Sequence, residues 1–106
     1  METQITPEEA PKVIHQFTGD VEQWRDLVSK YFPVGVVDEA LLIVLCESHG
    51  DPNAINSSGA SGLFQIIPLF HSEKIASRDI FNAEVNIDVA SQIYNDSQWN
   101  LWSCKP

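Results

Sequence analysis

The sequence has few basic residues and no long hydrophobic run. Among its 106 residues, 15 acidic side chains outnumber 6 basic ones, so the formal net charge at pH 7 is −9. An acidic surface repels phosphates, which speaks against a nucleic-acid partner. The longest apolar run covers only residues 40–46, whereas a helix needs about 20 apolar residues to cross a bilayer. We therefore expect neither nucleic-acid binding nor insertion in a membrane.

The first residues lack the pattern of a secretory leader. Residues 1–9 contain no basic segment followed by an apolar one. No Sec signal is visible, and two expectations stay open: release by another route, or a domain cut from a longer chain. Hydrophobic residues make up 43% of the sequence, and the length suits one folded domain, residues 1–106. We expect it to act as a monomer.

Signatures of metal and cofactor sites are also missing. The two cysteines, Cys46 and Cys104, stand far apart, and none of the three histidines has ligand spacing with them. No phosphate-binding or dinucleotide-binding glycine motif occurs. We expect no metal and no cofactor.

Helical signals recur along the chain and predict a mainly α fold. Thr6-Pro7-Glu8-Glu9 is typical of a helix start. A second helix is predicted from Gly19 to the residues before Pro33, with Asp20 as its cap, because apolar residues repeat there at helical spacing. Val36 to Ser48 is apolar on almost all sides, which is normal for the buried central helix of a small domain.

A polar loop follows that central helix. It contains Gly50, Gly59 and Gly62 among asparagines and serines, which indicates tight turns. For Leu63 to Ile67 the pattern leaves a helical turn and a strand open. A last helix is predicted from Phe81-Asn82 to about Asn95. The tail, 99–104, is expected to pack back on the domain or to line a groove.

Glu47 is the most informative residue. It stands at the end of the apolar run and before the glycine-rich loop. Partial burial there can keep a carboxyl protonated near neutral pH, because desolvation disfavours its charged form. A protonated carboxyl is what a general acid requires, and the loop beyond it could hold a substrate. The arrangement suggests cleavage of a glycosidic bond.

A larger set of motifs resembles a known family. The elements are Glu47-Ser48, then Asn53-x-x-Asn56-x-x-Gly59-Ala60-x-Gly62-Leu63-Phe64-Gln65-Ile66-x-Pro68, and later Asn86-Ile87. They resemble the soluble lytic transglycosylase and goose-type lysozyme family over residues 37–94. The tail is similar to short members from bacteriophages, endolysins among them, and Gram-positive bacteria. The resemblance implies a single lysozyme-like α domain with a central buried helix and a glycine-rich active-site loop.

The resemblance also implies a substrate and site residues. The substrate is peptidoglycan glycan, cut at the β-1,4 bond between N-acetylmuramic acid and N-acetylglucosamine, so the protein acts on the bacterial cell wall. Glu47 becomes the catalytic acid. Ser48 is expected to orient its carboxylate or to bind substrate, Gln65 to reach the sugar, and Asn86 to lie near the Glu47 end of the site.

Tyr94 departs from the family pattern by one position, so a core or groove-wall place and a substrate-binding role are both open. His49 occupies a variable position in the turn. A wall-degrading domain works outside the reducing cytosol, which favours a disulfide between Cys46 and Cys104 over two free thiols.

Three functions are compatible with this pattern. From Pro52 to Ser72 there is no Asp or Glu, whereas the two-carboxylate scheme for sugar hydrolysis needs a second acid. That absence favours a lytic transglycosylase, which forms 1,6-anhydromuramic ends with help from the substrate's own N-acetyl group. A hydrolysing lysozyme (muramidase) is the alternative, and a non-catalytic wall-binding module is the third. Asp51 is the one nearby acid, and its sequence context is typical of a turn.

Overall fold

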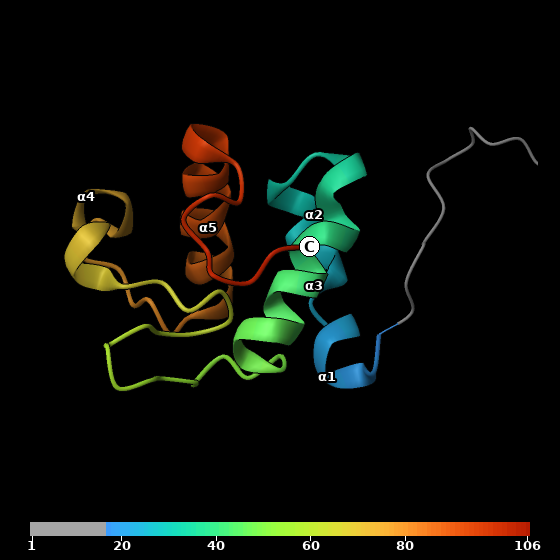
Figure 1. Cartoon of the computed structure of the whole chain (residues 1–106), viewed down its shortest axis with the longest axis horizontal. Coiled ribbons are helices and arrows are strands. Elements are labelled where there is room, and N and C mark those ends of the chain that lie inside the picture. Colours follow the sequence, from blue (N-terminus) through green and yellow to red (C-terminus); the bar gives the residue numbers. More distant parts are fainter. Residues whose placement is uncertain (1–16) are drawn as a thin grey trace, which may run out of the picture.

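The computed structural model describes residues 17–106 as helices joined by turns (Figure 1). The predicted mainly α class is confirmed. In this part of the chain β pairing is limited to two isolated bridges. The helix start expected at Thr6 lies outside the described residues. In chain order the elements are α1 (Gly19–Glu22), α2 (Arg25–Tyr31), the 3₁₀ turn η1 (Val34–Val36), α3 (Val37–Ser48), the 3₁₀ turn η2 (Pro68–Phe70), α4 (Ser72–Ile75) and α5 (Ala83–Ser97).

The second predicted helix, from Gly19 to the residues before Pro33, is divided into α1 and α2. Between them the Trp24 N–H donates to the Val21 carbonyl at 3.0 Å, a tighter turn than an α-helix makes. The Trp24 indole N–H donates to the Gly50 carbonyl at 2.9 Å, and this distant contact accounts for the break. The prediction that Asp20 caps the helix was wrong. The N-cap is Thr18, and Asp20 lies in the first turn, where its charge suits the positive helix end.

Two other helix boundaries, the end of α2 and the start of α5, are set by the residues at those positions. Phe32 is extended (φ −108°, ψ 150°), which is the conformation that the following Pro33 favours, and α2 ends there as predicted. Asn82 caps α5, because its side-chain oxygen accepts from the Val85 N–H at 3.1 Å. The predicted last helix is confirmed and continues slightly beyond its expected end, to Ser97.

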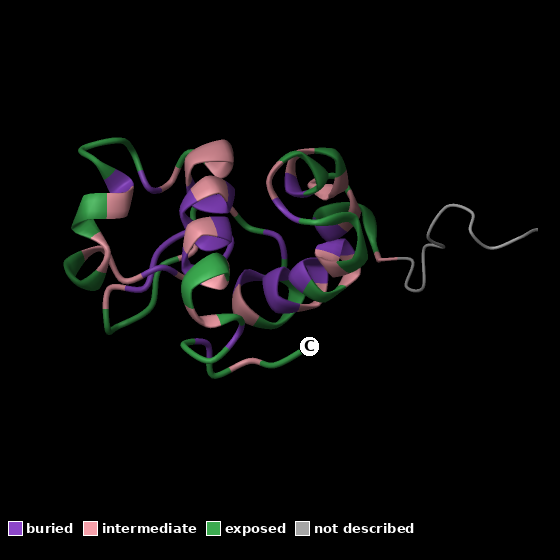
Figure 2. Cartoon of the chain, turned by 90° about the horizontal axis from the view of Figure 1, so that it is seen from above, coloured by how far each residue is buried: buried purple, intermediate pink, exposed green. Residues whose placement is uncertain are grey.

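α3 lies at the centre of the molecule, with α1 and α2 packed against it. Figure 2 shows buried residues along much of this helix and of α5. Near its C-terminal end, however, Leu45 and Cys46 are exposed. α3 therefore has a solvent-facing edge although its sequence is apolar almost all round. Its buried residues are Val37, Ala40, Leu41, Ile43, Val44 and Ser48.

The glycine-rich loop after α3 is held by its own hydrogen bonds. The Asn56 Oδ1 accepts from the backbone N–H of Ser58 and of Ala60 at 2.9 and 3.1 Å. Ser61 and Ile66 exchange backbone bonds of 2.8 and 3.0 Å. For the stretch 63–67 the sequence left a helical turn and a strand open. In the structure residues 62–65 form a tight turn closed by this exchange, Ile66 pairs with Ser61, and Ile67 follows outside the turn.

The C-terminal tail folds back from α5 onto the domain (Figure 1). The Trp99 indole N–H donates to the Glu39 carboxylate of α3, and the Trp102 indole N–H donates to the Phe64 carbonyl, both at 2.9 Å. Both indoles are buried, and their rings meet edge to face with centroids 5.2 Å apart. The tail is therefore part of the hydrophobic core.

Gly50→Ala is expected to destabilise the domain far more than Gly59→Ala. Both glycines have positive φ, +85° and +87°, so either alanine costs about 1–2 kcal/mol of backbone strain. A Cβ on Gly50 would lie 2.0 Å from the Asp20 carbonyl oxygen, whereas a Cβ on Gly59 meets open space. The clash should add roughly 1–3 kcal/mol. Urea unfolding measures the difference, and equal losses would contradict the close approach of α1 to Gly50.

Candidate active site

Glu47 lies in the last turn of α3, where the chain leaves the helix. His49 follows in the left-handed conformation (φ 54°) and Gly50 has φ +85°, which turns the backbone away from the helix axis. The Glu47 side chain is partly buried at this corner. The helix end thus presents the carboxyl at the edge of the domain.

The C-terminal tail returns to this same carboxyl. A disulfide joins Cys104 to Cys46, the neighbour of Glu47 on α3, with their Cα atoms 6.2 Å apart. The backbone N–H of Cys104 and the charge of Lys105 both act on the Glu47 carboxylate and favour its charged form. Residues from the middle of the sequence and from its C-terminal part therefore meet at Glu47.

Burial raises the pKa of Glu47 above its ordinary value, because desolvation disfavours the carboxylate. The Cys104 N–H and the Lys105 charge lower this pKa, but desolvation is the largest of the three influences. Glu47 therefore keeps its proton to a higher pH than a solvated glutamate does. This direction agrees with the expectation from its place in the sequence and suits a general acid.

Ser48 is buried and fixes the end of α3. Its hydroxyl donates to the Val44 carbonyl and accepts from the Gly50 N–H, each at 3.2 Å. Both bonds hold the backbone on either side of Glu47. The structure thus gives Ser48 a place in the helix end, and its contact with substrate stays a prediction.

Asn86 is fully buried in α5 and holds the loop in place. Its Oδ1 accepts from the Phe64 N–H at 2.8 Å, and its Nδ2 donates to the carbonyls of Ser61 and Ile80 at 2.9 and 3.0 Å. A Cβ on Gly62 would lie 2.3 Å from that Nδ2, so the glycine permits this close approach. The amide is satisfied by the protein itself, and a contact of Asn86 with sugar stays a prediction.

Gln65 lies on the loop that Asn86 holds. Its backbone has φ +52°, an unfavourable conformation for a residue with a side chain. Its Nε2 donates to the carbonyls of Ala54 and Gly62, both at 3.0 Å. The side chain is therefore fixed in one orientation. Strained backbone kept by surrounding bonds is frequent at functional sites.

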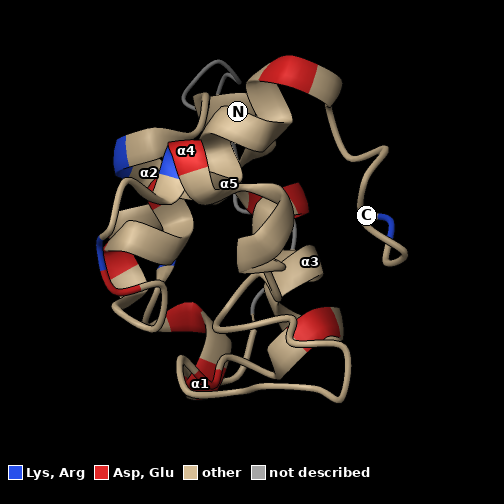
Figure 3. Ribbon diagram, turned by 90° about the vertical axis from the view of Figure 1, so that its left-hand side faces the viewer, with Lys and Arg blue, Asp and Glu red and all other residues tan. Residues whose placement is uncertain are grey.

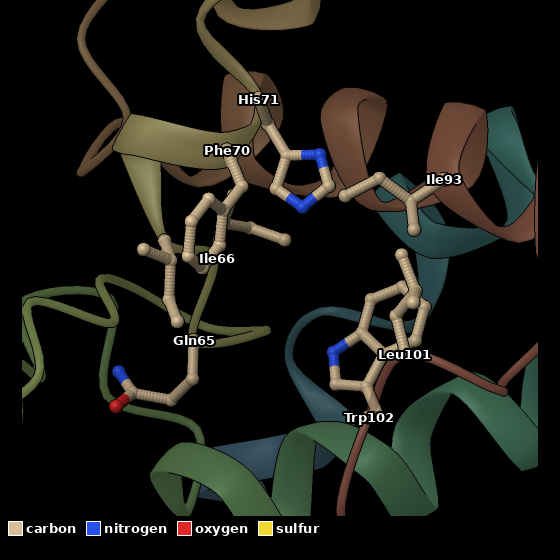
Figure 4. A pocket seen from close by; sticks show the side chains of 8 residues that line it. Gln65, Ile66, Phe70, His71, Ile93, Leu101 and Trp102 are labelled. Atoms are coloured by element: carbon tan, nitrogen blue, oxygen red, sulfur yellow. The ribbon is translucent and has the colours of Figure 1, made fainter.

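A groove of about 450 Å³ lies beside Gln65 (Figure 4). Its wall comes from the loop, from α5 and from the tail. Figure 4 shows the Gln65 amide pointing away from the other lining side chains, so its aliphatic part borders the groove. The lining is mainly apolar and comprises Gln65, Ile66, Ile67, Phe70, His71, Ile93, Leu101 and Trp102.

Several of these lining residues were not predicted as site residues from the sequence. Phe70 and Leu101 are 70% and 65% exposed, and exposed apolar side chains beside a groove are a common sign of a binding surface. Burial, followed by the nearby charge of Lys74, lowers the pKa of His71, so its imidazole is neutral at neutral pH. Local spacing gives no signal for these residues, because they gather only in the folded chain.

The groove and the candidate acid adjoin each other through the tail. Trp102 lines the groove, and two positions later the Cys104 N–H meets Glu47. Two residues of chain span at most about 7 Å. The same short stretch of the tail therefore contributes both to the groove wall and to the surroundings of Glu47.

Tyr94 lies elsewhere. Its ring packs on those of Phe32 and Trp99, with centroids 5.8 and 4.7 Å apart. Trp99 is bonded to Glu39, which belongs to the first turn of α3, whereas Glu47 belongs to the last. The structure thus groups Tyr94 with the aromatic core, and its substrate-binding role stays a prediction.

The surroundings of Glu47 hold little negative charge. Figure 3 shows the long loop after α3 drawn almost entirely in tan, since residues 52–72 contain no charged side chain. Asp51 is exposed, and its Oδ1 accepts from the Asn53 N–H at 2.9 Å. That bond makes Asp51 part of a turn, as predicted. Among the residues described, no carboxylate is a cause of the Glu47 pKa shift.

The residues that the structure describes also bear on metal binding and on membrane insertion. They contain no group of three or more His, Cys, Asp or Glu side chains that could hold a metal ion. None of their helices is both long and apolar enough to span a membrane.

Comparison with known proteins identifies the family of this chain. A search of curated proteins and a search of solved structures gave no significant match. The family model described as the transglycosylase SLT domain matches residues 35–101, more than half of the chain. This match covers Glu47, the glycine-rich loop and α5. The chain therefore belongs to the transglycosylase SLT domain family, whose domains cleave glycosidic bonds in peptidoglycan.

Proposed function

We propose that this protein is a peptidoglycan lytic transglycosylase. It cleaves the β-1,4 bond between N-acetylmuramic acid and N-acetylglucosamine and leaves 1,6-anhydromuramic ends. The observation that carries the proposal is Glu47, a partly buried carboxyl with a raised pKa at the end of α3. The groove lined by Gln65 and by the tail that leads to Glu47 supplies a place for the glycan strand.

Glu47 acts first as an acid and then as a base. Its proton moves to the glycosidic oxygen while the bond from that oxygen to C1 of the muramic acid breaks. The substrate's N-acetyl group stabilises the positive charge that develops at C1. The 6-hydroxyl oxygen of the same sugar then bonds to C1, and its proton returns to the Glu47 carboxylate. Glu47 ends the cycle protonated.

The surroundings of Glu47 favour this route over hydrolysis. Hydrolysis by two carboxylates needs a second one about 5 to 9.5 Å from the acid, and Asp51 is engaged in a turn. The substrate's own hydroxyl can compete well with water, because intramolecular groups reach very high effective concentrations. The muramidase remains the second candidate. A wall-binding module would have no need of an acid with a raised pKa.

The proposed reaction also implies a partner, an oligomeric state and a location for the protein. Its partner is the glycan strand of peptidoglycan, and it acts as a single domain, 1–106, and as a monomer. No cofactor enters the reaction. It faces the cell wall, as an endolysin or virion enzyme of a bacteriophage or as a bacterial wall enzyme.

Glu47→Gln should abolish wall cleavage without loss of the fold. The amide keeps the shape but cannot deliver a proton, and a general acid contributes a factor of about 10² to 10⁴. Turbidity clearing of purified cell walls measures the loss. Glu73→Gln, the same change at an exposed position of α4, is the matched control and should keep full activity. A Glu47→Gln variant with more than roughly a tenth of wild-type activity would exclude Glu47 as the acid.

The same variant should be at least as stable as wild type above the Glu47 pKa. Because the folded-state pKa is raised, the protonated carboxyl favours the folded state at low pH, and this contribution is lost as pH rises through that pKa. The amide in the variant does not titrate, so its contribution to stability does not fall as the pH rises. Melting temperatures measured from pH 4 to pH 8 check this, and a wild-type protein that grows more stable relative to the variant with rising pH would contradict it.

Digestion products should carry 1,6-anhydromuramic ends. An anhydro product is one water lighter than a hydrolysis product, so mass spectrometry of digested peptidoglycan separates the two outcomes. Asp51→Asn is the companion variant, because an asparagine oxygen can accept the same turn bond from Asn53. It should keep wild-type activity and products. Reducing-end muramic acid as the main product, lost in Asp51→Asn, would make the protein a muramidase.

A further inference from the structure

The disulfide Cys46–Cys104 lies next to the candidate acid and at the surface. Cys46 directly precedes Glu47 in α3, and its position is exposed, while Cys104 is partly buried. A thiol in solution can therefore reach this bond. Because one of its two cysteines is the neighbour of Glu47, any change at the bond acts close to the carboxyl.

The tail that this disulfide holds has two contacts with the candidate site. Leu101 and Trp102 line the groove. Cys104 and Lys105 then meet the Glu47 carboxylate through a backbone N–H and a positive charge. One short segment thus forms part of the groove wall and part of the surroundings of the acid.

Beyond Trp102 this segment has few other attachments. Trp102 itself is anchored by its indole bond to the Phe64 carbonyl, and Lys105 Nζ donates back to the Trp102 carbonyl within the tail. Among the described residues, the disulfide ties the chain after Trp102 to α3, and the Cys104 N–H and the Lys105 charge add attraction to the Glu47 carboxylate. Because the disulfide is covalent, it fixes this segment.

We propose that the segment Leu101–Lys105 is a positioning element for Glu47, and that the Cys46–Cys104 disulfide makes cleavage depend on oxidation. A dithiol reductant gives two electrons and two protons to the disulfide, which becomes two thiols, and is itself oxidised to a cyclic disulfide. The chain after Trp102 is then released and leaves Glu47, while the indole bond of Trp102 keeps the groove wall in place. This inference rests on the proposed function, and it adds that the oxidation state of the disulfide regulates cleavage.

The first test compares one preparation before and after reduction. The oxidised protein should contain no reactive thiol when unfolded, and the reduced protein should contain two. Complete reduction should lower kcat/KM roughly tenfold or more, since a small misplacement of catalytic groups can cost about 10²-fold. We expect the loss mainly in kcat, because the acid loses its neighbours while Trp102 stays anchored in the groove wall. An unchanged kcat/KM after complete reduction would overturn the proposal.

The double variant Cys46→Ala/Cys104→Ala is the control for the reductant. It should have the low activity of the reduced wild type, and the reductant should not change it. If it cleaves as fast as the oxidised wild type, the disulfide has no role in activity. Circular dichroism of the reduced protein distinguishes release of the tail from general unfolding. Release of the tail should leave the helical signal nearly unchanged, because the tail contains no helix. General unfolding would remove that signal.

A second pair of variants keeps the disulfide and tests the positioning directly. Charged or titratable groups near Glu47 are Lys105 on the tail and His49 and Asp51 in the exposed turn. Because the Lys105 charge lowers the Glu47 pKa, Lys105→Gln should raise it and move the alkaline limb of the kcat profile to higher pH. Lys105→Arg keeps the charge and should keep the limb. An unshifted limb in Lys105→Gln would refute the contact.

The outcomes also separate this inference from the proposed function. If the oxidised wild type does not cleave peptidoglycan, the proposed function fails and the inference fails with it. If oxidised and fully reduced proteins cleave equally well, only the inference fails.

Discussion

The buried amide of Asn86 is the interaction on which the geometry of the candidate site depends. Its three hydrogen bonds tie α5 to the turn that carries Phe64 and Gln65. Gly62 leaves the space that the amide needs, and the strained backbone of Gln65 is kept by the bonds around it. A half-satisfied buried amide would be costly, so the loop and the helix hold each other in one arrangement.

The C-terminal tail brings a backbone N–H and a positive charge to the acid. A carboxyl at the end of a helix is ordinarily solvated and ionised at neutral pH. Here partial burial raises the Glu47 pKa, while the Cys104 N–H and the Lys105 charge moderate the shift. The tail is placed by two buried indoles and one disulfide. Tail residues that lie outside the family's motifs therefore influence the pKa of Glu47, which belongs to one of those motifs.

Local patterns predicted much of this fold and part of the site. Pro33 and the Asn82 cap set helix boundaries by short-range effects, and the sequence contains both. The division between α1 and α2 could not be predicted, because it depends on the bond from Trp24 to Gly50. Glu47 was recognisable from its place between an apolar helix and a glycine-rich loop. The groove was not, since side chains such as His71 join it only through tertiary packing.

The central claim is that Glu47 is a general acid, and a titration of this one carboxyl tests it most directly. NMR of protein carrying ¹³C-labelled glutamate side chains gives the pKa of Glu47, assigned by its absence in Glu47→Gln. We predict a pKa above the ordinary value of a glutamate, and equal to that of the alkaline limb of cleavage in the free enzyme. A Glu47 pKa at or below the ordinary value, with cleavage continuing far above it, would contradict the account.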